Sequence, residues 1–246
     1  MANFRGQLAV MRMRLTLAAL AVLALAGCAG TPTAILASTR HGAPPAHVVT
    51  LSSAGQRRAT LAVLSGAASV TVSAAPMPGV LVRAWTPANS GIRPELVVVD
   101  GTVQVYLAST GNSGPAALWI RVSSAVRWGL QFSGGASETS VQMGNGQVSG
   151  IDFTAGSSLI TMGLPRPAGT VTITLAGGAS QVGVSLPTDI AARLQLFGGA
   201  SVATLGGQTY TGLAGGTVLT EPGWAGAADR YDLAAPAGVS QITVSG

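Results

Sequence analysis

The chain has 246 residues, and its 13 basic residues, all arginine, exceed its 8 acidic residues to give a formal net charge of +5. A single cysteine excludes an internal disulfide, and the 34 glycines disfavour long helices. Three of the arginines precede Cys28, so the remaining ten nearly balance the eight acidic residues. We therefore expect no nucleic-acid binding, which requires basic residues clustered on one face.

Residues 1–28 have the three parts of a secretory signal peptide. Arginines at positions 5, 12 and 14 precede an apolar stretch over residues 15–26, and small residues follow it. This stretch is too short to span a bilayer, which requires about 20 apolar residues. The segment therefore indicates export, and because its basic region is long, Met11 or Met13 is an alternative start.

The signal segment ends at the only cysteine of the chain. Leu25, Ala26 and Gly27 precede Cys28, an arrangement that resembles the bacterial lipobox. In lipobox proteins the signal is cleaved before the cysteine, which is lipidated and becomes the new N-terminus. The resemblance implies cleavage between Gly27 and Cys28 and a lipid such as palmitate on Cys28. It also implies anchoring on the extracytoplasmic side of the cell membrane, whereas an ordinary signal peptide containing a cysteine is the alternative.

Residues 29–47 are rich in alanine, glycine, threonine, serine and proline and show no helical or strand period. This composition predicts a flexible tether. Residues 48–246 then form one domain, long enough to bury a sizeable core.

The domain has the alternation of apolar and polar residues that is typical of half-buried strands. Residues 171–175 and 128–132 alternate clearly, and residues 239–245 do so more loosely. Residues 97–99 and 102–107 flank Asp100-Gly101, which predicts a hairpin on an Asp-Gly turn. We find no convincing amphipathic helix after the signal segment, so the domain is predicted to be all-β.

A short motif, Gly-Gly-Ala-Ser or a close variant, recurs along the domain. Its last residue falls at positions 137, 158, 180 and 201, a spacing of 21 or 22 residues, and each copy lies between two apolar stretches. A regular period near 20 residues is typical of stacked β units. The copies occupy residues 66–69, 134–137, 155–158, 177–180 and 198–201, with weaker copies at 215–217 and 237–240.

Two architectures are compatible with this repeat. The fixed spacing favours a β-solenoid, similar to a parallel β-helix, with coils of about 21 residues and the motif at each corner. The alternative is an antiparallel β-sandwich or meander with the motif at hairpin tips. In both, glycine permits the positive φ of a tight turn, and alanine and serine are small enough to stack in register.

The stretches 175–187 and 194–202 resemble the toast-rack or putative-adhesin β-repeat domains of bacterial envelope proteins. Both contain a small-residue glycine turn, and the first continues through a short strand to Leu186-Pro187. The resemblance covers about residues 125–246. It implies a repetitive β fold at the cell envelope with an adhesin-like role, and it supplies no catalytic residues.

The residue inventory limits the possible chemistry. The only histidines, His41 and His47, lie in or beside the tether, which excludes a Ser-His-Asp site and His/Cys metal sites within the β domain. A glycosidase needs two carboxylates, but most of the eight candidates fall in apparent turns. Asp152 with Arg166 or Arg193 is an alternative of the polysaccharide-lyase type. The carboxylates are Glu95, Asp100, Glu138, Asp152, Asp189, Glu221, Asp229 and Asp232.

Each of three further features has a structural and a functional interpretation. Asp229 and Asp232 flank a short stretch that is a turn or, alternatively, a Ca²⁺ ligand pair. Trp128 alternates in phase with Leu130 and Phe132, which predicts a core position. Trp224 lies in a turn after Pro222-Gly223 and is predicted to be exposed, so it is a candidate ligand contact.

These observations favour a lipid-anchored, non-enzymatic envelope protein whose β-repeat domain serves surface interaction, envelope structure or signalling. We expect no cofactor and no metal. The expected partners are the membrane, through the N-terminal lipid, and a cell-wall or protein partner. A module that binds a cell-wall glycan or another ligand is the first alternative, and a polysaccharide-acting enzyme on a β-solenoid is the second.

Overall fold

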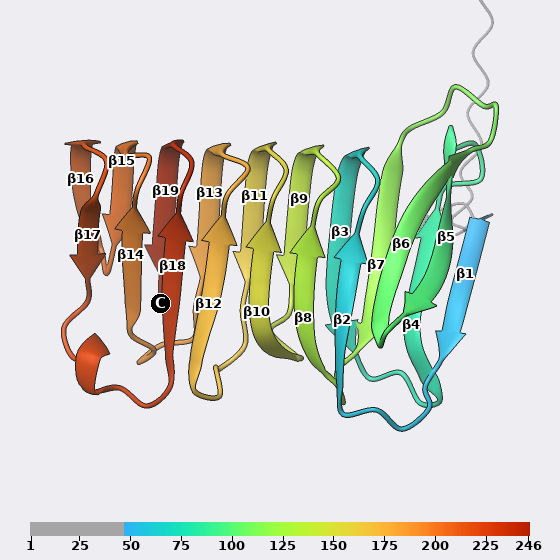
Figure 1. The fold of residues 1–246 in the computed structure, drawn as a ribbon, viewed down its shortest axis with the longest axis horizontal. Coiled ribbons are helices and arrows are strands. Elements are labelled where there is room, and N and C mark those ends of the chain that lie inside the picture. The colour runs from blue at the N-terminus through green and yellow to red at the C-terminus, as the bar shows by residue number, and fades with distance from the viewer. Residues whose placement is uncertain (1–46) are drawn as a thin grey trace, which may run out of the picture. The chain divides into compact units, whose positions relative to one another are not determined.

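A computed structural model describes residues 47–246, which form two stacked β-sheets (Figure 1). Within this range the only helical element is the short 3-10 turn η1 (Trp224–Gly226), and no helix is long and apolar enough to cross a membrane. The expected all-β fold is confirmed. The signal segment, Cys28 and most of the tether lie outside the described residues.

Sheet A has ten strands and sheet B has nine. In spatial order, sheet A contains β1 (His47–Ser52), β4 (Val80–Thr86), β7 (Ala117–Ser123), β3 (Ala67–Ala75), β9 (Ala136–Gln142), β11 (Ser157–Gly163), β13 (Ala179–Ser185), β19 (Val239–Ser245), β15 (Ala200–Leu205) and β16 (Gln208–Leu213). Sheet B contains β17 (Thr217–Thr220), β14 (Ala192–Leu196), β18 (Arg230–Ala235), β12 (Thr170–Leu175), β10 (Gln147–Phe153), β8 (Arg127–Phe132), β2 (Arg58–Val63), β6 (Thr102–Ser109) and β5 (Ile92–Val99).

The middle of both sheets is built from repeated two-strand units. In each unit a strand of sheet B leads through a glycine corner into a strand of sheet A, as in β8–β9, β10–β11 and β12–β13 (Figure 1). Neighbouring units pair in parallel and in register, so that Leu130 lies beside Ile151 and Ile151 beside Ile173. The repeated motif therefore marks the corner of each unit.

Both ends of the sheets are antiparallel instead. Strands β1 and β4 end sheet A on one side and β16 on the other, while β5 and β17 end sheet B. The sheets are thus mixed, with parallel pairing in the middle and antiparallel pairing at both ends. The hairpin expected at Asp100-Gly101 joins β5 to β6, with φ of 48° and 77° at the two turn residues.

The units do not follow one another in chain order, as coils of a simple solenoid would. The last unit, β18–β19, lies between β12–β13 and β14–β15. Likewise β2–β3 lies between β6–β7 and β8–β9. In each case two units that follow one another along the chain are separated in space by a third unit, which comes later in the sequence for β18–β19 and earlier for β2–β3.

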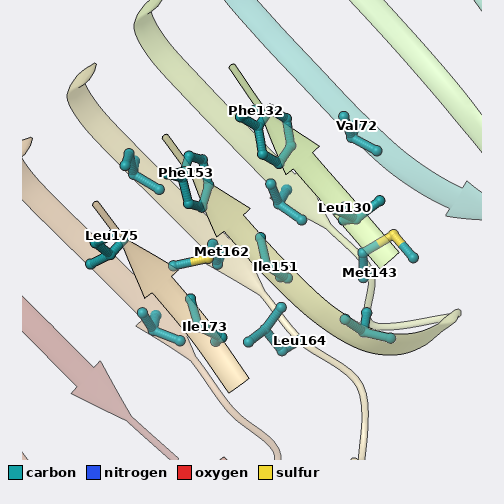
Figure 2. Close-up of a cluster of buried hydrophobic side chains, with 14 of the residues drawn as sticks. Val72, Leu130, Phe132, Met143, Ile151, Phe153, Met162, Leu164, Ile173 and Leu175 are labelled. Atoms are coloured by element: carbon teal, nitrogen blue, oxygen red, sulfur yellow. The ribbon is translucent and has the colours of Figure 1, made fainter. Parts of the chain in front are cut away.

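The core lies between the two sheets, where alternate residues of each strand point inward (Figure 2). Equivalent positions of successive units stack, and the rings of Phe132 and Phe153 lie 4.6 Å apart with an interplanar angle of 9°. Trp128 is fully buried, as its alternation predicted, and its indole N–H donates to the Ser123 carbonyl at 2.9 Å. The period-2 pattern therefore becomes a continuous apolar layer.

The corner glycines are required for two different reasons, only one of which the sequence suggested. Gly178 and Gly199 do adopt positive φ, at 73° and 79°. Gly134 and Gly177, the first glycines of their motifs, do not; instead they lie directly against the backbone of the neighbouring corner. A Cβ on Gly177 would be 2.6 Å from the Gly156 nitrogen and closer still to the Ala155 carbonyl. Glycine at this position therefore permits close stacking of units.

Candidate interaction surface

The carboxylates singled out in the sequence do not converge. Within residues 47–246 no group of three or more His, Cys, Asp or Glu side chains is placed to hold a metal ion. Asp152 of β10 shares a register row with Gln195 of β14, but strands β12 and β18 lie between them. Three strand spacings amount to roughly 14 Å. Arg193, which lies on the same strand as Gln195, is therefore too far from Asp152 to form an ion pair with it. Arg166 instead donates to the Thr188 carbonyl at 3.4 Å.

Trp224 is buried, so the prediction that it is exposed was wrong. Only 9% of the residue is accessible, because two arginines from neighbouring strands of sheet B cover its ring. The guanidinium carbons of Arg193 and Arg230 lie 3.9 Å and 4.3 Å from the ring centroid. The indole N–H donates to the Tyr231 carbonyl at 2.8 Å. Trp224 thus fastens η1 to the outer face of sheet B.

Asp232 completes this arrangement, which we call the Trp224 clasp (Arg193, Trp224, Arg230 and Asp232). Arg193 donates to both carboxylate oxygens of Asp232, at 3.0 and 2.5 Å, and Gln195 donates to one of them at 2.9 Å. Burial alone raises the pKa of Asp232, but the hydrogen bonds from Arg193 and Gln195, together with the charges of Arg193 and Arg230, outweigh it and lower the pKa.

The Asp232 interactions also argue against the Ca²⁺ alternative. Asp232 is occupied by Arg193, while Asp229 accepts a hydrogen bond from the Gly169 amide at 2.6 Å. The two carboxylates therefore have separate internal partners. We interpret the Trp224 clasp as structural, because each of its charged groups already has a partner within the fold.

A second group of charged and aromatic side chains lies on the outer face of sheet A. Trp85 of β4 and Trp119 of β7 are cross-strand partners whose ring centroids are 6.4 Å apart, with an interplanar angle of 15°. Arg83 and Arg121 are the next outward pair along the same strands, and the Arg121 guanidinium carbon lies 5.5 Å from the Trp85 ring centroid. We call these four residues the tryptophan–arginine patch.

The alternation of the two strands makes this patch face outward. Ala84 and Ile120, the residues between the patch positions, are fully buried in the core. The arginines are exposed, and the tryptophans are partly exposed. The same alternation is visible in the sequence, where Trp119 lies between Leu118 and Ile120 and Trp85 follows Ala84 in phase with Arg83.

The two arginines of the patch have no carboxylate within salt-bridge distance. The ion pairs of the described range are Arg93–Glu95 and Arg193–Asp232, neither of which involves the patch. Glu138 is the only acidic residue in the strands of sheet A, and β3 separates its strand, β9, from β7. The patch is therefore a locally positive region on an otherwise nearly uncharged face.

A row of small and hydroxyl-bearing side chains continues from Trp119 across the rest of sheet A. The register of the strands aligns these residues one strand apart, which is about 4.8 Å. We call them the polar row: Thr71, Ser140, Thr161, Gly183, Thr243, Thr204 and Thr209.

The polar row is hollowed at Gly183 of β13. A Cβ at this position would have no other atom within 4 Å. The hollow measures about 250 Å³, and Leu159, Gln181 and Gln241 line it beside the hydroxyl residues Thr161 and Thr243. The outer face of sheet A therefore offers amide and hydroxyl groups around an open depression, with the cationic and aromatic patch at one end of the row.

Comparison with known proteins supports the fold. No family model matches the chain, and no curated protein matches it significantly. A solved structure of a putative cell adhesion protein from Clostridium sporogenes is similar over 80% of this chain and 97% of its own, with a TM-score of 0.61 and 13% identity. A putative adhesin from Bacteroides fragilis aligns over 80% of this chain and 96% of its own at 10% identity, with a TM-score of 0.23 that is too low to indicate a shared fold. The first likeness shows the fold alone.

Proposed function

We propose that this protein is a lipid-anchored, non-enzymatic component of the bacterial cell envelope that acts by adhesion-like contact. The observation that carries the proposal is the outer face of sheet A, where a positive aromatic patch adjoins a continuous polar surface. The fold shared with a putative cell adhesion protein supports it. We further propose that the parallel units form a short β-solenoid and that the antiparallel strands at each end act as its caps.

The anchor rests on the sequence around Cys28. A basic region, a short apolar stretch and small residues before the cysteine support cleavage between Gly27 and Cys28 and lipidation of Cys28. The alanine- and proline-containing stretch up to residue 46 then gives the domain reach from the membrane. The domain would thereby be presented on the extracytoplasmic side.

A non-enzymatic role agrees with how the charged groups are used. Asp232 is engaged by Arg193, Asp229 by a backbone amide and Glu95 by Arg93. The outer face of sheet A instead has cations without carboxylate partners beside partly exposed aromatic rings. Such a face is suited to reversible binding, because its guanidinium donors have no carboxylate partner among the described residues.

Two measurements on bacteria that express the chain test this proposal. A Cys28→Ser variant should leave the membrane fraction, and cells expressing the unaltered chain should adhere to envelope-coated surfaces more than cells expressing the variant. Retention of the variant in the membrane would refute the lipid anchor. Equal adhesion by both strains and by cells without the protein would refute the adhesive role.

A further inference from the structure

We propose that the tryptophan–arginine patch and the polar row bind one chain of an acidic polysaccharide, lying across the strands of sheet A. This inference rests on the proposed function, since it takes the outer face of sheet A as the contact surface. The ligand class follows from three features of that face: unpartnered cations, adjacent indole rings, and a long row of neutral hydrogen-bonding groups.

The cations favour an anionic ligand. Arg83 and Arg121 lie directly opposite one another, and like charges in that position are destabilising in a sheet. No carboxylate of the described residues offsets them within salt-bridge distance. A ligand carboxylate would do so through the paired N–H donors of a guanidinium, which match carboxylate geometry.

The indoles favour a sugar ring over a simple anion. Trp85 and Trp119 stand on neighbouring strands with near-parallel rings whose centroids are 6.4 Å apart, so the two indoles place apolar aromatic surface beside the arginines. The C–H face of a pyranose is apolar, while its hydroxyls and any carboxylate lie at the rim, where the arginines are. Aromatic rings with nearby polar groups are suited to ligands that combine both characters.

The polar row favours a polymer over a membrane surface. Thr71, Ser140 and Thr161 continue the line of Trp119 at one-strand intervals of about 4.8 Å, which is comparable to the rise of an extended glycan. The hollow at Gly183, with the amides of Gln181 and Gln241, lies further along the same row. A lipid surface would bury these hydroxyls without partners, which is unfavourable.

Binding of polygalacturonate to the full chain purified in mild detergent tests the inference, with titration calorimetry as the readout. Dextran serves as the neutral polymer, polyphosphate as a charged polymer without sugar rings, and phosphatidylglycerol vesicles as the membrane. We expect polygalacturonate to bind, and dextran and vesicles to bind at least about tenfold more weakly. Any binding of polyphosphate should be the same with and without the side chains of Trp85 and Trp119. Preference for vesicles or for dextran over polygalacturonate would overturn the inference.

Three variants separate the parts of the site. Arg83→Gln with Arg121→Gln, and Trp85→Ala with Trp119→Ala, should each weaken polygalacturonate binding at least about tenfold. Arg58→Gln removes one positive charge from an exposed position on sheet B and should leave binding unchanged. Unaltered binding in either double variant, with the thermal unfolding midpoint within a few degrees of the parent, would overturn the inference.

Filling the hollow tests whether the ligand is a polymer. A Cβ at Gly183 has no other atom within 4 Å, so Gly183→Val places its side chain in the hollow. We expect this variant to weaken binding of polygalacturonate but not of tri-galacturonate, which would reach only the patch. Equal effects on both lengths would overturn the polymer arrangement. If all acidic glycans fail to bind while cell adhesion persists, this inference fails and the proposed function stands.

Discussion

Replacing Gly177 with alanine should destabilise the domain strongly, although the side chain added is a single methyl group. Gly177 occupies the corner between β12 and β13, where its amide donates to the Phe153 carbonyl at 3.0 Å. The new Cβ would lie 2.6 Å from the Gly156 nitrogen and would overlap the Ala155 carbonyl. Ordinary contacts between such atoms are about 3.5 Å or more, so one corner must move by roughly 1 Å.

The size of the effect follows from what has to move. Both sides of the contact are backbone, so no side chain can rotate away to relieve it. Overpacking of this kind typically costs about 1–3 kcal/mol, and we expect the upper end of that range. For a domain of this size, about 3 kcal/mol lowers the unfolding midpoint by roughly 6–12 °C.

Thermal unfolding followed by circular dichroism measures this difference, with Gly183→Ala as the matched control. Gly183 lies on the neighbouring strand, has an ordinary φ and has space for a Cβ. That substitution should be neutral or stabilise the fold by up to about 1 kcal/mol, because alanine restricts the unfolded chain. Equal midpoints for Gly177→Ala and the parent protein would refute the stacked-corner explanation.

Three more outcomes are expected. Asp232→Asn should lower the free energy of unfolding by about 1–3 kcal/mol at neutral pH. Because the pKa of Asp232 is lowered in the folded state, this difference should disappear as the pH falls through that pKa. Urea midpoints of variant and parent that differ equally at neutral pH and at about pH 2 would contradict it. Trp224→Ala should cost about 3–5 kcal/mol in the same assay, whereas a loss below about 1 kcal/mol would contradict its burial between Arg193 and Arg230. Deleting residues 229–246 should abolish cooperative unfolding, since it leaves β12 and β14 without their shared partner β18; an intact transition would favour chain-order stacking.

The local features of the fold were predictable because they depend on neighbouring residues. Alternation placed Trp128 in the core, and the Asp100-Gly101 dipeptide gave the hairpin between β5 and β6. The repeated motif marked the unit corners, although close stacking at Gly177, and not positive φ, explains its first glycine. Each of these predictions used only a short window of sequence.

The order of the units was not predictable in this way. Strands β12, β14 and β18 share the same alternating apolar pattern, so any of them satisfies the inward face of sheet B equally well. Their order depends on non-local pairing and on how the ends are capped. The same limit applies to Trp224: its turn gave no sign that Arg193, far away in the sequence, would cover the ring.

The candidate surface was partly visible in the sequence. Trp119 lies between the inward residues Leu118 and Ile120, and Trp85 lies between the inward residues Ala84 and Thr86, which indicates an outward orientation for both rings. Their proximity depends on the antiparallel pairing of β4 with β7, which are separated along the chain by β5 and β6. The patch therefore became evident only when the register of sheet A was known.

Binding to isolated cell envelopes tests most directly whether the outer face of sheet A is the contact surface. The full chain carrying Cys28→Ser would be sedimented with envelopes, alone and with either Arg83→Gln/Arg121→Gln or Arg58→Gln. We predict that the chain cosediments, that the sheet A double variant stays largely in the supernatant, and that the sheet B variant cosediments like the parent. Cosedimentation of the sheet A variant to the same extent as the parent would contradict the account.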